Sequence, residues 1–451
     1  MNAGARLDRL PISSFHRRIM WLIGAGMFFD GFDIYLAGIV LGATVKSGFS
    51  TLGQNAEFVS VTFVGMMLGS FVTGFLGDRF GRRFTYQSNL AIFGFASIAA
   101  AFAPSMQVLI LIQFIIGFGL GAENVVGYST LTEFVPPQSR GKWLGLMTVF
   151  VVTGLPVAAL LGTLIIPKLG WRAMFVIGGL GALVVWYLRK ALPESPRWLE
   201  SVERTEEADA LLHAIEREVS LQHSPLPTPK LSPLVKHSRN IASLMSSAIF
   251  PRMILGSVSL IMINSLLYGF VTWLPTFFVQ QGLSIAKSFR YSLVMALGAP
   301  LGSAIGAFTA DSWGRKPTII GASSFTILIG SFYPFIKNPV ILMVTGFSLI
   351  IPIYVLVALL FAIYIPELFP TEVRLRASGI CNTFGRGAII FTPFLVVALF
   401  RLHGVGGVLV FMIGLLIVEI LVVLTLGVEP KKRRLEEIES ETTATPYPAK
   451  V

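Results

Sequence analysis

Apolar runs long enough to cross a bilayer recur along almost the whole chain. A transmembrane helix needs about 20 mostly apolar residues, because the hydrocarbon core is about 30 Å thick. Of the 451 residues, 54% are hydrophobic and 13% are charged, and the mean hydropathy of +0.75 exceeds that of ordinary soluble domains. We therefore predict an all-α membrane protein with twelve transmembrane helices, at about residues 19–41, 57–76, 84–103, 107–131, 142–166, 172–192, 253–279, 290–310, 317–336, 339–365, 376–400 and 404–427.

Several classes of protein are disfavoured by what the sequence lacks. The first apolar run is too long for the core of a secretory signal and no cleavage site follows it, so we expect a retained helix. The one cysteine, Cys381, lies in the eleventh run, which leaves no disulfide framework and no metal-ligand cluster. No phosphate-binding loop or nucleophile arrangement occurs, so neither an enzyme nor an ATP-driven pump is expected, and no cofactor or metal.

The net charge of +11 is explained by membrane topology. If the N-terminus is cytoplasmic, lysine and arginine concentrate in the loops that would then be cytoplasmic, as the positive-inside rule requires. Both termini are therefore expected inside the cell, and "KKRR" at 431–434 is expected to anchor the chain at the membrane surface. The predicted partners are a lipid bilayer and a small molecule, with no nucleic acid.

An internal repeat divides the chain into two halves of six helices. "GDRFGRR" at 77–83 returns as "ADSWGRK" at 310–316, and "EFVPPQSR" at 133–140 returns as "ELFPTEVR" at 367–374, with offsets of 233 and 234 residues. Repeats with an even number of helices enter the membrane from the same side and are related by an axis along its normal. The predicted parts are a first bundle (1–192), a cytoplasmic linker (193–250), a second bundle (251–430) and a tail (431–451).

The linker is expected to carry one surface helix. Residues 201–218 are charged and amphipathic, whereas "SPLPTPKLSP" at 224–233 carries four prolines and is typical of an extended connector.

The loop motifs resemble those of the major facilitator superfamily. "GFLGDRFGRR" at 74–83 and "DSWGRK" at 311–316 are similar to its loop signature, and "PESPRWL" at 193–199 is similar to the end-of-first-half signature of its sugar-porter and organic-ion branches. The resemblance implies a monomeric secondary transporter of the bacterial inner-membrane kind, which works by alternating access of a central site. It also implies a conformational-gating role for Gly74, Asp78, Arg79, Gly81, Arg82, Asp311, Gly314 and Arg315.

Two segments point to a branch within this superfamily. "DGFD" at 30–33 resembles the helix 1 element of the aromatic-acid/proton symporters, and "GRGAIIFTPFL" at 385–395 is similar to their helix 11 segment. The fourth run departs from that branch, because Gln113 stands where many members carry arginine and Glu123 is an additional acid. Its glycines, among them Gly117 and Gly121, are expected to allow close helix contact.

Asp30 and Asp33 lie three residues apart, on one face of the first helix and near the bilayer midplane. An ionised group there costs roughly 2.5 to 3.5 kcal/mol on insertion scales, so intramembrane acids are candidate functional groups. Two acids in a medium of low dielectric constant favour proton uptake by at least one of them. We predict that the pair couples transport to protons, and the alternative is a structural aspartate or a permanent pair with Arg386.

Arg386 is expected to be the only cation deep within a membrane segment. Its planar fork of donors suits a carboxylate or phosphate, which predicts an anionic substrate; the alternative is an ion pair with Asp30, Asp33 or Glu123. Glu123 is either a second proton site or part of helix packing. Asn264 occupies the repeat position of Asp30 and is expected at the substrate site, together with the nearby aromatic residues Phe32 and Tyr35.

The predicted function is import of a small organic anion, such as an aromatic carboxylate, together with protons. A sugar or polyol porter and an efflux transporter for drugs or organic cations remain as alternatives, as does a transporter-like sensor that binds without transport. Arg386 argues against the sugar and cation alternatives, and the short tails argue against the sensor.

Overall fold

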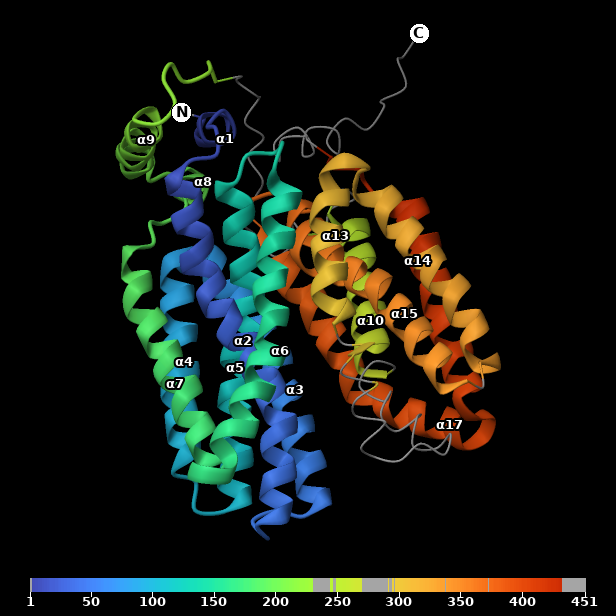
Figure 1. The fold of residues 1–451 in the computed structure, drawn as a ribbon. Helices are drawn as coiled ribbons and strands as arrows, with labels where there is room; N and C mark the ends of the chain where they lie inside the picture. The colour runs from blue at the N-terminus through green and yellow to red at the C-terminus, as the bar shows by residue number, and fades with distance from the viewer. Residues whose placement is uncertain are drawn as a thin grey trace.

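The computed structural model describes residues 2–229, 244–245, 249–269, 291, 294–295, 297–336, 338–371 and 373–431. Within these ranges every regular element is a helix and none is a strand, which confirms the predicted fold class. Figure 1 shows the helices of the first half on one side and those of the second half on the other. The predicted domain boundaries at 192, 250 and 430 stay predictions.

Six long helices make up the first half. They are α2 (Ser14–Lys46), α3 (Leu52–Phe80), α4 (Arg82–Ala101), α5 (Met106–Phe134), α6 (Arg140–Leu169) and α7 (Arg172–Leu188), which continues into the short 3₁₀ turn η1 (Arg189–Ala191). The second half contributes α10 (Phe250–Gly269), α13 (Gly298–Ser312), α14 (Arg315–Phe332), α15 (Pro339–Val357) and α17 (Arg374–Leu426).

Nine helices within the described ranges are long and apolar enough to cross a membrane. The predicted span 253–279 is counted through its described part, Phe250–Gly269, whereas the predicted spans 19–41, 84–103 and 290–310 are not among the nine. Part of the span 290–310 lies outside the described residues. The last two predicted spans run on as one element, α17, broken at Gly404, whose φ of 64° is left-handed. The long apolar helices otherwise fall where the periodicity of the sequence predicts them.

Three short helices gather at one end of the molecule, shown at the top of Figure 1. They are α1 (Ala3–Asp8), α8 (Pro196–Ser201) and α9 (Thr205–Ser220). Helix α9 confirms the predicted surface helix, and its buried face consists of Ala208, Leu212, Ile215 and Val219. Glu216 of α9 pairs with Arg6 and Arg9, at 2.7 Å in each case. We call this the linker end of the molecule.

Two glycines make equivalent tight turns at the linker end. Gly81 joins α3 to α4 with a φ of 97°, and Gly314 joins α13 to α14 with a φ of 106°. Residues with a side chain rarely adopt these values, so both repeated motifs require glycine at this position. At each turn a Cβ would also collide with a carboxylate, that of Glu194 beside Gly81 and that of Glu429 beside Gly314.

Glycines bring α3 and α5 into backbone contact. A Cβ on Gly117 would meet the carbonyl group of Thr62, and one on Gly121 would meet that of Met66. The expected role of these glycines in close helix contact therefore agrees with the packing. Because the obstacle is backbone and not a movable side chain, even one added methyl group must separate the two helices.

We expect Gly121→Ala to destabilise the protein by about 1–3 kcal/mol, the usual cost of overpacking. Gly414→Ala is the matched control, because nothing lies within 4 Å of its Cβ position. Thermal unfolding of both purified variants in one detergent measures the difference. Equal melting temperatures for Gly121→Ala and the unsubstituted protein would contradict this packing.

Candidate functional site

A cavity lies between the two halves of the chain. Its walls come from α2, α5 and α6 on one side and from α10, α15, η5 (Ala358–Tyr364) and α17 on the other. The residues that line it are Gly31, Ile34, Asn124, Tyr128, Thr148, Val151, Val152, Asn264, Leu267, Tyr268, Tyr354, Val357, Phe361 and Arg386. We call it the central cavity. It combines four aromatic rings, two amides and one cation.

Part of the wall is a π-helix, η5 (Ala358–Tyr364), which follows α15 directly. It leads into the short helix α16 (Ile365–Glu367), whose Pro366 has no N–H to close a normal helical turn. Such π-helical turns often occur at functional sites. Here the π-helix carries Phe361, whose ring lies 5.8 Å from the guanidinium carbon of Arg386.

Arg386 is only 4% exposed, yet it forms no ion pair with any described residue. Its Nε atom has no hydrogen-bond partner. The cation therefore faces the central cavity with donor capacity to spare, and this is the arrangement that an anionic ligand would need. The alternative of a direct ion pair with Asp30, Asp33 or Glu123 does not occur in this arrangement.

The two aspartates of α2 are buried behind the cavity wall. Asp30 is 1% exposed and its Oδ2 accepts a hydrogen bond of 3.3 Å from Asn124 Nδ2, while its Oδ1 has no partner. Asp33 is 2% exposed and its Oδ2 has no hydrogen-bond partner. Each of the two acids therefore keeps one buried oxygen without a hydrogen-bond partner.

Glu123 pairs with a cation that we did not expect inside the bundle. Arg189 lies at the end of a candidate span, is fully buried, and places Nη1 2.5 Å from Glu123 Oε1. Its other nitrogens donate to the carbonyl groups of Leu22 and Ile23, at 2.7 and 2.6 Å. The expectation that Arg386 is the only deep cation is wrong, because the long side chain of Arg189 reaches inward from the helix end.

The remaining predicted substrate residues are not all at the cavity. Asn264 lines it from the second half, with Oδ1 unpartnered and Nδ2 bonded to Leu260 O. Phe32 instead packs inside the first half, in ordinary contact with the Cβ position of Gly178 on α7, and does not line the cavity. The side chain of Tyr35 lies outside the described residues.

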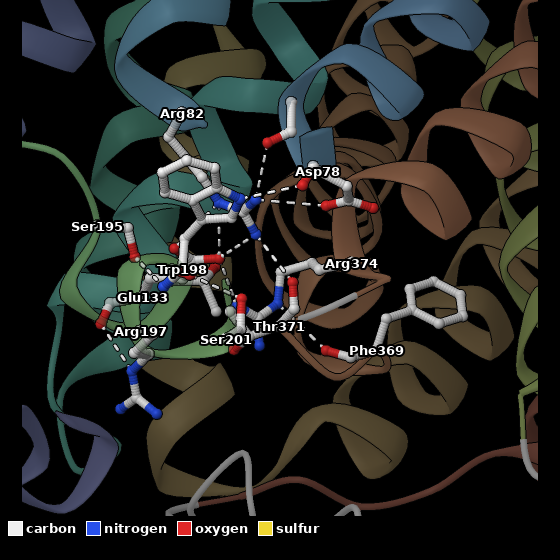
Figure 2. A network of polar contacts seen from close by, with 12 residues as sticks. Asp78, Arg82, Glu133, Ser195, Arg197, Trp198, Ser201, Phe369, Thr371 and Arg374 are labelled. Atoms are coloured by element: carbon white, nitrogen blue, oxygen red, sulfur yellow. Dashed lines mark hydrogen bonds and ion pairs between the residues drawn. The ribbon is translucent and has the colours of Figure 1, made fainter. Parts of the chain in front are cut away.

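Around the motif at 77–83, a buried charge network joins the two halves at the linker end (Figure 2). Arg82 donates through Nη2 to Glu133 at 2.7 Å, and Arg374 of the second half donates to the same carboxylate at 2.8 Å. Asp78 pairs with Arg82 at 3.3 Å and accepts from both the backbone N and the Nε of Arg376, at 3.1 and 3.0 Å. Asp78 thereby reaches the first turn of α17, where free N–H groups favour an anion.

The motif at 310–316 builds a matching network in the second half. Arg315 donates two hydrogen bonds of 2.9 Å to Glu367, and Asp311 pairs with Arg315 at 3.0 Å. Asp311 also accepts from the backbone N of Gly141 and of Lys142, at 3.1 and 2.7 Å, in the first turn of α6. Each half thus presents an aspartate to the start of a helix in the other half.

Close helix crossings accompany these contacts. Gly74 of α3 lies against Leu375 and Arg376 of α17, where a Cβ would be 2.7 Å from the Leu375 carbonyl oxygen. Arg79 is the exception among the predicted gating residues, because it is exposed and lies over the Phe80 ring at 5.3 Å. Within the described ranges, every ion pair that joins the two halves lies at the linker end.

Some residues of these networks received no predicted role. They are Glu133, Arg140, Arg189, Glu194, Glu367, Arg374, Arg376 and Glu429. For Glu133, Arg140, Glu367 and Arg374 the signal was present, because all four belong to the second repeated motif. Glu194 and Glu429 each accept hydrogen bonds from the two backbone N–H groups that follow a motif glycine. Glu194 belongs to the motif at 193–199, whereas no quoted motif includes Glu429.

We expect Asp78→Asn to open the linker end, because it removes the charge that holds the start of α17. The readout is maleimide labelling of Asn382→Cys, at a cavity wall near that end, in a Cys381→Ser background. The rate of labelling should rise by about fivefold or more, because a loss of about 1 kcal/mol in the stability of the closed arrangement raises the open population by about that factor. Glu207→Gln, which disturbs only the exposed pair with Arg204, is the control; equal rates for both variants would rule out this role.

We expect Arg189→Met alone to lower stability by about 3–5 kcal/mol, because it strands the buried Glu123 carboxylate. Combining it with Glu123→Gln should restore part of that loss, and a thermal-unfolding double-mutant cycle measures the coupling. The exposed Arg204–Glu207 pair provides the control cycle, for which we expect no measurable coupling. Simple additivity at Arg189 and Glu123 would contradict a pair that neutralises buried charge.

Comparison with known proteins places this arrangement in a family. The family model for sugar (and other) transporters matches residues 20–441. The inner membrane metabolite transport protein YdjE of Escherichia coli is 38% identical over 96% of this chain and 98% of its own length. The niacin transporter NiaP of Acinetobacter baylyi is 32% identical over 97% of this chain and all of its own length.

The fold also matches solved structures. The proton:xylose symporter XylE of the major facilitator superfamily, bound to 6-bromo-6-deoxy-D-glucose, superposes with a TM-score of 0.78, covering 95% of this chain and 99% of that one at 18% identity. A partially occluded inward open XylE structure gives 0.68, with coverage of 92% and 99%. The chain shares the fold of the major facilitator superfamily symporter XylE, and it is a multi-pass membrane transporter, not an enzyme, that belongs to the sugar (and other) transporter family.

Proposed function

We propose that this transporter imports a small organic anion, such as an aromatic carboxylate, together with protons. The observation that carries the proposal is Arg386, a buried cation that lines the central cavity and has no ion-pair partner among the described residues. A buried charge without a partner is costly. An anionic substrate would supply the missing partner, with two parallel hydrogen bonds from the guanidinium to a carboxylate.

The rings of the cavity support an aromatic substrate. Phe361 lies beside Arg386, and Tyr128, Tyr268 and Tyr354 also line the cavity. Aromatic side chains contribute large apolar contact areas and prefer offset or edge-on packing against another ring. One relative, from Acinetobacter baylyi, is named as a niacin transporter. Niacin is a pyridine carboxylic acid and therefore an aromatic carboxylate.

Asp30 and Asp33 are the proposed proton carriers, and Glu123 is the weaker candidate. Both aspartates are buried and neither pairs directly with a cation, whereas Glu123 is neutralised by Arg189. A proton that moves down a potential of 100 mV releases about 2.3 kcal/mol, which is sufficient for useful accumulation. XylE, which has the same fold, is named as a proton:xylose symporter, and this likeness supports the proposal of proton coupling.

The repeated loop motifs are the proposed gate. Asp78 and Asp311 hold the linker end closed through the starts of α17 and α6, while Arg82 and Arg315 bind Glu133 and Glu367 in the same networks. Gly74, Gly81 and Gly314 allow the required close approaches. We propose that the linker end faces the cytoplasm, following the positive-inside rule. The closed linker end then corresponds to a cavity that exchanges with the outer side.

A sugar porter is the second candidate. Asn124 and Asn264 line the cavity with amide groups that could bind hydroxyls, and the matching family model is that of sugar (and other) transporters. Arg386 weighs against it, because a neutral sugar would leave that cation unpaired. Efflux of organic cations is opposed by the same residue, since like charges would meet inside the cavity.

The test is uptake into proteoliposomes that contain the purified protein. Labelled nicotinate and benzoate should accumulate when the outside is made acidic, whereas xylose and arabinose should not. Arg386→Gln should lower carboxylate uptake by about tenfold or more, the typical value of a charged hydrogen bond. Arg386→Lys should recover only part of the carboxylate uptake that is lost in Arg386→Gln, because lysine lacks the planar fork of donors.

Arg401→Gln is the matched control, because Arg401 is exposed and does not line the cavity. Uptake of sugars alone, or anion uptake that is unchanged in Arg386→Gln, would refute an anion site at Arg386. Anion uptake that is indifferent to pH in the unsubstituted protein would refute proton coupling.

A further inference from the structure

Asn124 of α5 stands between the buried acid Asp30 and the central cavity. Asp30 itself does not line the cavity, and its Oδ1 is buried without a hydrogen-bond partner. Its Oδ2 accepts from Asn124 Nδ2 at 3.3 Å. Among the described residues, Asn124 is the side chain that both hydrogen-bonds to Asp30 and lines the cavity. It also lines the small adjoining cavity, together with Ser129, Ser378 and Asn382.

The amide nitrogen of Asn124 is fully committed in this arrangement. Its two hydrogens serve Asp30 Oδ2 and Leu120 O, at 3.3 Å in both cases, near the long limit for N–H···O bonds. The Oδ1 atom accepts no hydrogen bond from any described residue. An ionised carboxylate is only an acceptor, so it requires the nitrogen half of the amide. The part of the Asn124 amide that remains free to face the cavity is its oxygen, an acceptor, which disfavours the binding of an anion there.

We propose that Asn124 is a positioning residue whose amide rotation conveys the protonation state of Asp30 to an anion in the central cavity. This inference rests on the proposed function of anion import. A proton that arrives from the outer side binds to the Asp30 carboxylate, and no other covalent bond changes. Neutral Asp30 has an O–H to donate, which the oxygen of Asn124 can accept. A half turn of the amide, whose terminal torsion is broad and roughly two-fold, then presents N–H to the cavity beside Arg386.

The charged groups around Asp30 allow its charge to act on the anion site directly, without Asn124, and the experiment must distinguish this effect from the amide rotation. The titratable groups that act on Asp30 or feel its charge come from α2, α4, α5, η1 and α17, and they are Asp33, Tyr86, Glu123, Tyr128, Arg189 and Arg386. Glu123 and Arg189 neutralise each other at 2.5 Å. Ionised Asp30 also attracts Arg386 through space, and this attraction alone could weaken anion binding without any participation of Asn124.

Thermodynamic linkage fixes the direction of the effect. If protonation of Asp30 tightens anion binding by some factor, then the bound anion must tighten proton binding by the same factor. One hydrogen bond from an amide to a charged group corresponds to about tenfold in affinity. The affinity for the anion should therefore rise by about that factor as the pH falls through the titration of Asp30.

The experiment measures binding of labelled nicotinate to the purified full-length protein at acidic and alkaline pH. We expect binding about tenfold tighter at acidic pH in the unsubstituted protein, and the same affinity at both pH values in Asn124→Leu. Asn124→Gln, which keeps the amide, should restore part of the pH dependence. Asn264→Leu, which removes the amide of the opposite wall, should weaken binding but keep the ratio between the two pH values. Asn124→Ser, too short to reach Asp30, is a second variant with the same expectation as Asn124→Leu.

Two results of the binding assay would overturn the inference. One is a pH ratio that survives in Asn124→Leu and Asn124→Ser but disappears in Asp30→Asn, which would assign the effect to direct attraction between Asp30 and Arg386. The other is nicotinate binding without pH dependence in the unsubstituted protein.

A measurement without substrate separates this inference from the proposed function. Infrared titration can identify the C=O band of protonated Asp30 as the band that is lost in Asp30→Asn. We expect this band at higher frequency in Asn124→Leu, because the hydrogen bond to Asn124 is absent. An unshifted band would overturn the role of Asn124 even if nicotinate is transported. A shifted band without carboxylate binding would support the contact and leave only the anionic substrate refuted.

Discussion

The cost of burying a charge in a membrane-spanning bundle organises this structure. An ionised side chain in hydrocarbon costs several kcal/mol unless it has a partner. Arg82 has Glu133, Arg315 has Glu367 and Arg189 has Glu123, all within 2.9 Å. The one deep cation left without such a partner among the described residues, Arg386, is also the one that lines the central cavity. Because the other buried arginines are paired, the unpaired Arg386 is the distinctive charge of the cavity.

The same constraint explains the repeat. Each half supplies an arginine that binds a glutamate of its own half, and an aspartate that reaches the first turn of a helix in the other half. Asp78 meets Arg376, whereas Asp311 meets Lys142, 234 residues earlier than Arg376. Each of these contacts joins a side chain to backbone N–H groups at a helix start, where the field favours an anion.

The sequence predicts the fold well because hydropathy and the motif repeat are properties of local stretches. It also predicts the cavity position of Arg386 and Asn264, through helix rise and repeat symmetry. It fails for Arg189, which the hydropathy places near the end of the predicted span 172–192, because a long side chain at a helix end can turn inward. It fails for Phe32 as well, because the direction of one aromatic ring depends on which neighbouring helix offers space, here beside Gly178. Asn124 gave no signal, since one amide in a glycine-rich run resembles a packing residue.

The proposed gate and the central cavity share two helices. Helix α5 carries Asn124 at the cavity and Glu133 in the network at the linker end, and α17 carries Arg386 at the cavity and Arg376 at the linker end. Ten residues of helix separate Arg376 from Arg386, about 15 Å. A helix segment of that length moves nearly as a rigid body. The positions of α5 and α17 at the linker end therefore determine the distance between Asn124 and Arg386 at the cavity. A ligand that bridges Arg386 and Asn124 would therefore act on the gate without touching it, because it would favour the helix positions in which Glu133 meets Arg374.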